Sequence, residues 1–304
     1  MKLTRLLGLC SMVLFSTACG SDDVTTNGSD ESTPNVFAIQ STIVQSMPAD
    51  PTQPTGRAPQ LDENGAGSFS SGDVNELLFF TEENKTLQHF SYTYGKTYYW
   101  NDIDLPAEVE SCQLVAWYPA VSAANPADIA WDVLKQKEQP DLLAAGAVKV
   151  SPDQTARVDL TFKHLMHKLQ VKVVSENPDV TDQDLQKATV DCQNVLPVAH
   201  INLLTGKTTS ADGQAANFSQ KGAKTAFILP AQNVGDMEVV LNLKGKTVRF
   251  KMAEIQVNGQ PVKSLESGKT LSVNITVTKN DFIISGQNIS GWENQGDFNE
   301  DIII

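Results

Sequence analysis

The stretch ARVDLTFKHLMHKLQVKVV, residues 156–174, alternates apolar and polar side chains over most of its length. Alternation with a period of two puts every second side chain on one face of a β-strand. This stretch is the longest strand candidate in the chain, and it indicates that the ordered part of the protein is built from β-sheet.

Short β-rich runs separated by turn residues lie on both sides of this stretch. They span residues 76–80, 87–94, 96–100 and 112–118 before it, and 199–204, 224–230, 237–245, 246–252, 270–278 and 282–292 after it. Many short strands with regular turns are typical of antiparallel β-sandwiches, and the ordered sequence of about 230 residues exceeds the ~100 residues of a single sandwich. We therefore predict an all-β protein with two tandem antiparallel β-sandwich domains, at residues 58–160 and 161–304.

Minor helical inserts are expected between the strands. In PADIAWDVLKQKE (126–138), the apolar residues Ile129, Val133 and Leu134 lie on one face at helical spacing, which predicts a short helix. The acidic run DVTDQDL (179–185) is expected to form a solvated turn.

A separate strand candidate precedes the first predicted domain. Residues 20–35 are polar without an apolar period, which indicates a flexible tether. The run VFAIQSTIVQS (36–46) is β-rich and has Phe37, Ile39 and Ile43 at odd spacing, although Val44 breaks the alternation. Residues 47–68 contain four prolines and three glycines and predict a loop too long for a simple hairpin connection.

The loop after this strand contains one of three arginines that follow the first 18 residues. Arg157 and Arg249 lie inside alternating strand runs, where an ordered ladder resists proteases. Arg57 lies in the Pro- and Gly-rich loop, where nicking concentrates, and is followed by Ala58. A trypsin-like protease would therefore cut between Arg57 and Ala58. The other interpretation is an ordinary loop arginine.

Residues 1–18 have the layout of an export signal. Lys2 and Arg5 precede a short apolar core at 6–15, which is too short to span a bilayer. The small residues 16–18 lead directly to Cys19, as in the lipobox of bacterial lipoproteins, where the cysteine becomes lipidated. Ser16 stands where that pattern usually has Leu. We predict lipidation of Cys19; the alternative is an ordinary cleaved signal.

The charge of the chain argues against nucleic acid as a partner. Loss of the export signal, with its two cations and no acid, takes the formal net charge from −13 to −15. No basic patch is present that could neutralise phosphates. This negative net charge suits a protein domain that is held away from an anionic cell surface.

Cys112 and Cys192 remain once Cys10 leaves with the signal and Cys19 carries lipid. In an oxidising compartment they could form one disulfide, provided that their Cα atoms lie close enough. Two separate buried thiols are the alternative.

Motifs for catalysis or metal binding are incomplete. His164 and His167 form HxxH without the Glu of HExxH, and three-residue spacing in a strand points the rings to opposite faces, so both are expected to be structural. Asp297, Asn299 and Asp301 lack the glycine and the final Glu of an EF-hand loop. We predict no catalytic residues, no metal site, no cofactor and no enzymatic activity.

Several stretches resemble the fimbrillin family of Bacteroidetes, the lipoprotein precursors of type V pili. The family's F-x-H strand is similar to VDLTFKHLMHKLQVKVV (158–174), with Phe162 and His164 in the matching places. Further similar segments are FSSGD (69–73), QPDLLAAGAVKVS (139–151), INLLTG (201–206), AFILPAQ (226–232) and LESGKTLSVNITVTKNDFIISGQNISGW (265–292), which ends in Ile289 and Trp292. The acidic residues after Cys19 look like the export tag of surface lipoproteins in the same bacteria.

The resemblance implies transthyretin-like sandwiches and a role as a pilus subunit that serves adhesion. In such pili an arginine-specific protease removes a first strand, and a strand from the next subunit replaces it. Mapped onto this chain, residues 19–57 are the tether and removable strand, with Phe37, Ile39 and Ile43 as residues of that strand, and Arg57–Ala58 is the cut. The implied partners are other copies of the chain, accessory pilins and a host or bacterial surface receptor.

The donor strand would lie in the chain after Lys279. Its candidate plugs are Phe282, Ile284, Ile289 and the terminal residues Ile302, Ile303 and Ile304. The alternative is that this run is an edge strand of its own domain.

The implied location is the cell surface, first as an outer-membrane lipoprotein precursor and then in the fimbrium. Other interpretations are an uncleaved anchor pilin, a tip pilin, or a monomeric surface glycan-binding lipoprotein. A glycan-binding face usually exposes aromatic residues, whereas three of the four tryptophans, Trp100, Trp117 and Trp131, lie in strand or helix patterns that indicate core.

Overall fold

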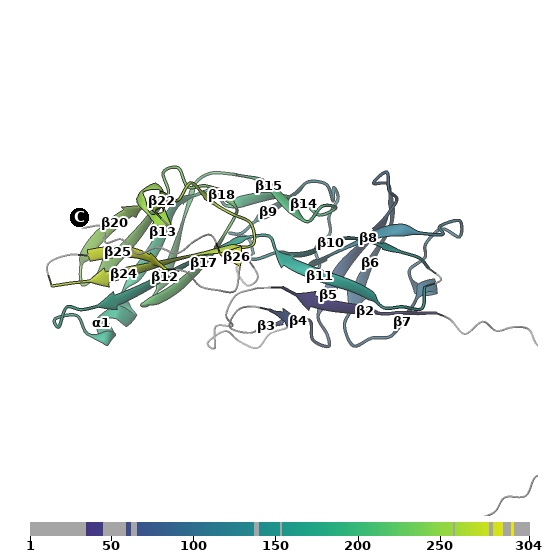
Figure 1. Ribbon diagram of the computed structural model, residues 1–304, viewed down its shortest axis with the longest axis horizontal. Helices are drawn as coiled ribbons and strands as arrows, with labels where there is room; N and C mark the ends of the chain where they lie inside the picture. The colour runs from purple at the N-terminus through teal and green to yellow at the C-terminus, as the bar shows by residue number, and fades with distance from the viewer. Residues whose placement is uncertain are drawn as a thin grey trace, which may run out of the picture. The chain divides into compact units, whose positions relative to one another are not determined.

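The computed structural model describes most of the chain after residue 34. The described residues are 35–44, 59–61, 66–136, 140–152, 154–257, 259–279, 282–287 and 293–294. They belong to one compact unit, Pro34–Ile304. Almost all of the regular structure is β-strand, which confirms the predicted all-β class (Figure 1). Within these residues, no helix has the length and apolar character needed to cross a membrane.

The first large sheet has eight strands in the order β3-β4-β2-β11-β10-β8-β5-β6. These strands are β2 (Ile39–Ile43), β3 (Gln60–Leu61), β4 (Gly67–Ser68), β5 (Val74–Phe80), β6 (Thr86–Thr93), β8 (Cys112–Tyr118), β10 (Leu143–Val150) and β11 (Val158–His164). In β11 buried and exposed residues alternate strictly, because Val158, Leu160 and Phe162 share the inner face. A separate two-stranded pair joins β1 (Val36–Phe37) to β7 (Tyr98–Tyr99), which runs into a 3-10 turn at Trp100–Asp102.

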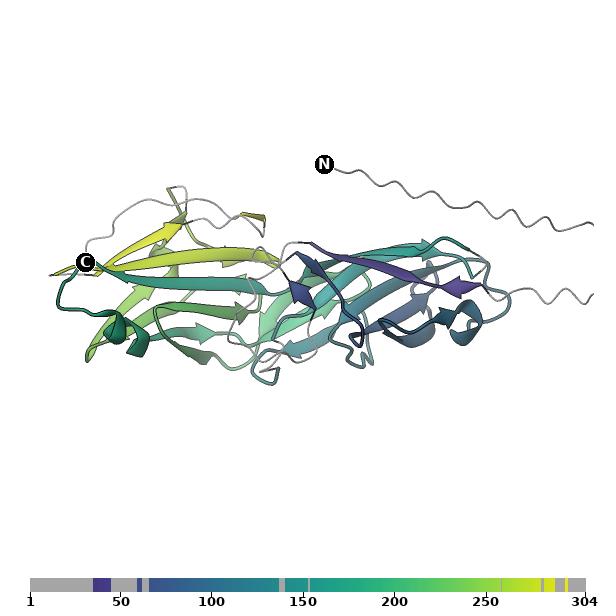
Figure 2. The ribbon, with the colours of Figure 1, turned by 90° about the horizontal axis from the view of Figure 1, so that it is seen from below.

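Two further sheets come from the second half of the chain. The five-stranded sheet contains β17-β12-β24-β25 with β26 also on β24, and the four-stranded sheet has the order β16-β13-β19-β20. The bounds are β12 (His167–Ser175), β13 (Thr189–Val195), β16 (Ala216–Lys221), β17 (Lys224–Leu229), β19 (Glu238–Leu243), β20 (Lys246–Lys251), β24 (Lys269–Val277), β25 (Phe282–Gln287) and β26 (Glu293–Asn294). The apolar faces of these two sheets pack on each other (Figure 2).

A three-stranded sheet, β15-β14-β9, combines strands from both halves of the sequence. It consists of β9 (Ile129–Asp132), β14 (Val198–Asn202) and β15 (Lys207–Asp212). The remaining pairs are β18 (Gln232–Asn233) with β23 (Ser264–Leu265) and β21 (Gln256–Val257) with β22 (Gln260–Pro261), after a 3-10 turn at Met252–Glu254.

The helix predicted at 126–138 is wrong. Residues 129–132 form β9, whose Ile129 and Trp131 pair with Ile201 and Ala199 of β14. Trp131 and Val133 are both buried, at a spacing of two, while Leu134 is 40% exposed. Pairing with a distant strand overrode the local helical spacing.

The α-helix of the described residues lies instead in the acidic run that was expected to be a turn. It is α1, Asp182–Lys187, and Thr181 is its N-cap. The Thr181 hydroxyl accepts from the Asp184 amide at 3.2 Å, and the Asp184 carboxylate accepts from the Thr181 amide at 3.0 Å. This reciprocal pair is a capping box, so the acids that indicated a solvated turn begin a helix.

Residues 156–174 form two strands rather than one. β11 ends at His164 in the eight-stranded sheet, and β12 begins at His167 in the five-stranded sheet. Leu165 and Met166 between them are both buried, which interrupts the alternation. The chain changes sheets a few residues after the predicted domain boundary at 160, and the division into two sandwiches stays a prediction.

Three apolar clusters hold these layers together. The first core contains Phe37, Ile43, Phe69, Leu77, Phe79, Trp100, Leu114, Leu160 and Phe162, among others. The middle core lies on the other face of the same strands and includes Leu78, Trp117, Trp131, Leu165, Met166, Ile201 and Ile228. The last core fills the space between the two C-terminal sheets.

Candidate functional site: an N-terminal edge strand

The segment at residues 35–44 supplies side chains to the first core. Phe37 is 1% exposed and Ile43 is fully buried, while Ile39 is partly buried against the same cluster. The Phe37 ring contacts four aromatic rings, and its centroid lies 4.7 Å from that of Trp100 and 5.8 Å from that of Tyr92. Burying one such ring is worth about 1.5–3 kcal/mol, so the segment is an integral part of this core.

The backbone of the same segment completes the eight-stranded sheet. β2 runs parallel to β11, from Ile39 opposite Val158 to Ile43 opposite Phe162. The Val158 amide donates to the Ala38 carbonyl at 2.8 Å, and the Val44 amide donates to the Phe162 carbonyl at 3.0 Å. In Figures 1 and 2 the purple β2 lies alongside β11.

The outer side of β2 has little coverage among the described residues. Its ladder with β4 consists of one pair, Ile43 with Gly67. β2 therefore lies near the edge of the eight-stranded sheet, and its segment supplies apolar side chains to the first core. The three residues predicted for the removable strand, Phe37, Ile39 and Ile43, are brought together here. Cys19, Arg57 and Ala58 lie outside the described residues.

The C-terminal candidates divide into two groups. Phe282 and Ile284 lie in β25, which is antiparallel to β24 with Val277 opposite Phe282 and Ile275 opposite Ile284. Ile284 is 2% exposed in the last core, and Phe282 packs against the same cluster. Among the described strands, β25 is thus the outermost strand of its own sheet. Ile289 and Ile302–Ile304, like Trp292 and residues 297–301, lie outside the described residues.

The disulfide considered for Cys112 and Cys192 is not formed. Both thiols are free and buried, Cys112 in the first core and Cys192 in the last core. Burial raises the pKa of Cys112 to about 11 and that of Cys192 to about 12. The two residues are structural apolar groups, because each lies on the inner face of a strand in a different core.

His164 and His167 are both buried, and they lie in two different strands, the end of β11 and the beginning of β12, rather than in the single strand expected from the sequence. The Nδ1 atom of His164 is hydrogen-bonded to the Asp141 carboxylate, and Nδ1 of His167 lies 3.0 Å from the Glu266 carbonyl oxygen. Burial lowers the pKa of His167 to about 4. No group of three or more ligand side chains that could hold a metal occurs in the described part of the chain.

A buried lysine next to these histidines, Lys168, was not identified from the sequence. Lys168 is 2% exposed, and burial lowers its pKa to about 7 against the opposing effect of Asp141. Alternation places Lys168 on the face opposite Leu169, which reads as a solvent face. Ile228, the ladder partner of Lys168, belongs to the middle core, which covers this face. Alternation shows which side chains share a face but not whether another layer packs on that face.

His200 of β14 bridges the bend before β9 to β15. Its Nδ1 lies 2.9 Å from Asp128 and its Nε2 lies 3.0 Å from Asp212. The hydrogen bonds to Asp128 and then to Asp212 raise the pKa of His200. Because both carboxylates are more than half exposed, this bridge adds little to stability.

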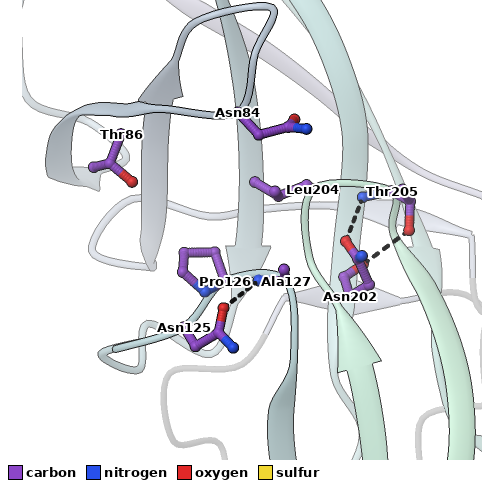
Figure 3. Close-up of a pocket in the computed structure, with 8 residues that line it drawn as sticks. All are labelled: Asn84, Thr86, Asn125, Pro126, Ala127, Asn202, Leu204 and Thr205. Carbon is purple, nitrogen blue, oxygen red and sulfur yellow. Dashed lines mark hydrogen bonds between the residues drawn. The ribbon is translucent and has the colours of Figure 1, made fainter.

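A pocket of about 350 Å³ lies between turns rather than at the strand site (Figure 3). It is lined by Asn84, Thr86, Asn125, Pro126, Ala127, Asn202, Leu204 and Thr205. The side-chain oxygens of Asn125 and Asn202 accept backbone hydrogen bonds within their own turns, from Ala127 and Thr205. The tryptophans Trp100, Trp117 and Trp131 are all buried, as predicted, and do not line it.

Comparison with known proteins places this architecture in a family. A family model described as fimbrillin-like matches residues 61–292, so the chain belongs to the fimbrillin-like family. A curated Bacteroides uniformis protein named "Putative fimbrium subunit Fim1C" is 25% identical over 236 residues, covering 75% of each chain.

Solved structures show the same fold. One crystal structure, of a "putative cell adhesion protein" from Bacteroides uniformis, has a TM-score of 0.58 and 20% identity, covering 72% of this chain and 91% of that one. Another protein with the same description, from Bacteroides ovatus, has a TM-score of 0.57 and 16% identity, covering 88% of this chain and all of that one.

Proposed function

We propose that this chain is the precursor of a cell-surface fimbrial subunit that serves adhesion. In this proposal, a lipid on Cys19 holds the precursor at the outer membrane during export. An arginine-specific protease then cuts between Arg57 and Ala58 and releases residues 19–57. The subunit exchanges its lipid anchor for a place in a polymer of other copies and accessory pilins, which presents it to a host or bacterial surface receptor. Family membership and the names of the relatives support the fimbrial role.

The observation that carries this proposal is the position of residues 35–44. They precede the part matched by the family model, yet they supply Phe37 and Ile43 to the first core and a ladder partner to β11. Their loss would leave unpaired backbone groups and an uncovered apolar face, which is a template for another strand. If the strand comes from the next subunit, the contact is head-to-tail and extends into a filament.

We propose the C-terminal segment as the donor. Donation by β25 would require it to separate from β24, because Phe282 and Ile284 pack in their own last core. The candidates beyond it, Ile289 and Ile302–Ile304, would not require this step. Serine substitution of Ile302–Ile304 is therefore expected to abolish polymers while leaving a folded monomer. Substitution of Ile284, by contrast, is expected to unfold the last core.

The test is N-terminal sequencing and intact mass of protein sheared from the producing cells. Wild-type protein should begin at Ala58, carry no lipid and run as a ladder of polymers. Arg57→Lys should keep a lipidated Cys19 and give no polymer, while the control Arg249→Lys behaves as wild type. A wild-type chain that begins at lipidated Cys19 would contradict the cut and would identify an uncleaved anchor or a surface binding lipoprotein.

A further inference from the structure

Arg157 is not inside a strand, contrary to the expectation from its sequence. It is exposed and lies immediately before β11, whose first residue is Val158. Arg249, in contrast, lies within β20 opposite Val240, and its guanidinium is 3.0 Å from Glu238. Arg157 is therefore an exposed arginine outside any strand ladder, and Arg249, inside a ladder, serves as its control.

The strand that follows Arg157 depends on β2. β10 pairs with β11 only over residues 162–164. In the described part of the chain, the ladder partner of Val158–Thr161 is β2, which pairs with each of these residues. Among the described residues, removal of β2 would leave the first half of β11 without a ladder partner on either side. Such a half-strand opens more readily than the rest of its sheet.

The connection before Arg157 is tied to the same N-terminal segment. The Trp100 indole donates to the Gln154 carbonyl at 3.2 Å, and the Gln154 side chain donates to the Ala156 carbonyl at 3.2 Å. Trp100 is itself held by residues 35–37: its amide donates to the Asn35 carbonyl at 3.0 Å, and its ring contacts Phe37. Losing residues 35–44 thus loosens both sides of the Arg157–Val158 bond.

We infer that Arg157–Val158 is a second arginine cleavage site, which residues 35–44 keep closed. Proteases bind and cut the opened chain, so the rate follows the population of the open form. Hydrolysis would add water across this amide bond, leaving a carboxylate on Arg157 and an amine on Val158. Any strand that occupies the place of β2 would close the site again.

The second cleavage site would distinguish subunits that have received a donor strand from those that have not. This consequence rests on the proposed cut at Arg57. A subunit that has lost its own strand and gained no donor would be cut within its first sheet by a protease of the same specificity. A subunit in the polymer would be protected.

The experiment treats the full-length protein, purified in detergent, with an arginine-specific endopeptidase and identifies fragments by mass. In the wild type, the cut after Arg157 should follow the cut after Arg57. In Arg57→Lys, the cut after Arg157 should slow by at least about tenfold, which corresponds to about 1.4 kcal/mol of opening free energy. Arg157→Lys should stop at the first cut, and Arg249→Lys should match the wild type. If the wild type is cut at Arg57, equal rates of cleavage at Arg157 in the wild type and Arg57→Lys would overturn the inference.

Adding the strand back tests the closure directly. After the first cut and removal of the released fragment, a peptide of residues 35–46 should slow the second cut by at least about tenfold, the same change in opening. A scrambled peptide should not. If the site at Arg157 stays uncut after the strand is removed, the inference fails while the proposed processing at Arg57 stands.

A further variant separates the two proposals if Arg57 is never cut. Phe37→Ala with Ile43→Ala weakens the hold of β2 on the intact chain and should speed the cut after Arg157. The rate of cutting at Arg249 should stay unchanged, because β20 belongs to another sheet. Faster cutting at Arg157 alone would support the inference although the proposed processing fails. An unchanged rate, or equal acceleration at both arginines, would contradict the inference.

Discussion

At the scale of the residue, Phe37 and Val36 show how differently two neighbours in one strand contribute. Phe37 is 1% exposed among four aromatic rings, whereas Val36 is 48% exposed. The contrast arises because successive residues of a strand face opposite sides. Substitution of Phe37 therefore measures how strongly the N-terminal segment stabilises the first core.

Phe37→Ala should lower the free energy of unfolding by about 3–5 kcal/mol, because it leaves a cavity among packed rings. Val36→Ala should change the free energy of unfolding by no more than about 0.5 kcal/mol. Urea denaturation followed by tryptophan fluorescence measures both, since Trp100 contacts the Phe37 ring. Equal effects of the two substitutions would show that the segment is not packed in the core.

The buried imidazole of His167 makes stability depend on pH. Its pKa is lowered to about 4 by burial, whereas a histidine in the unfolded chain titrates near 6.5. The unfolded state therefore binds more protons between these values. The stability contributed by neutral His167 is fully present above about pH 6.5 and falls by roughly 3 kcal/mol as the pH drops to 4.

His167→Asn should flatten the dependence of the unfolding free energy on pH between about 6.5 and 4, because the titrating group is gone. The asparagine amide can still reach the Glu266 carbonyl oxygen that Nδ1 of His167 contacts. Denaturant titrations at several pH values give the slope, and a slope unchanged in His167→Asn would contradict the assignment.

At the scale of the element, β11 is one strand with two kinds of support. Its last three residues pair with β10, and the first of these, Phe162, also pairs with β2; its first four residues pair with β2 alone in the described part of the chain. The side chains of Val158 and Leu160 are nevertheless buried. The strand is therefore held at its beginning by side-chain packing and one neighbour.

Hydrogen exchange should reveal this difference. In the intact chain, the amides of Val158 and Leu160, which point toward β2, should be protected, and after residues 19–57 are cut away they should exchange at least about tenfold faster, as expected for local opening. The control is β19, which lies between β13 and β20 and should keep its protection. Unchanged exchange at Val158 and Leu160 would mean that another part of the chain holds the strand.

At the scale of the whole molecule, the corner between β11 and β12 connects the sheets. The Gly268 amide donates to the Met166 carbonyl at 2.9 Å, and the hydroxyls of Thr208 and Ser267 donate to the Leu165 carbonyl at 2.9 Å and 2.8 Å. The turn before β24 therefore docks closely on the corner at which the chain leaves the eight-stranded sheet.

Gly268→Ala should disturb this docking. A Cβ at Gly268 would lie 2.9 Å from the His164 carbonyl oxygen, while Gly259 has the same φ of +71° and open space around it. Both alanines incur the strain of positive φ, so the difference between them reports the contact. Gly268→Ala should be less stable than Gly259→Ala by about 1–3 kcal/mol in denaturant titrations. Equal stabilities would show that the turn can move away freely.

The sequence by itself determined the features that depend on local alternation. It placed the β-rich runs and put Phe37 and Ile43 on one face of a strand, because a period of two assigns the faces of a strand without knowledge of its partner. It also carried enough of the F-x-H strand to indicate the family.

Tertiary structure alone decided the features that depend on distant partners. Residues 129–132 are a strand because β14 pairs with them, and Lys168 is buried because the middle core covers its face. The thiols of Cys112 and Cys192 stay apart because their strands belong to different cores. The dependence of β11 on β2, and the position of Arg157 just outside the ladder, follow from the strands that lie on either side of β11. Such pairing is set by contacts across the whole chain, which local periodicity does not encode.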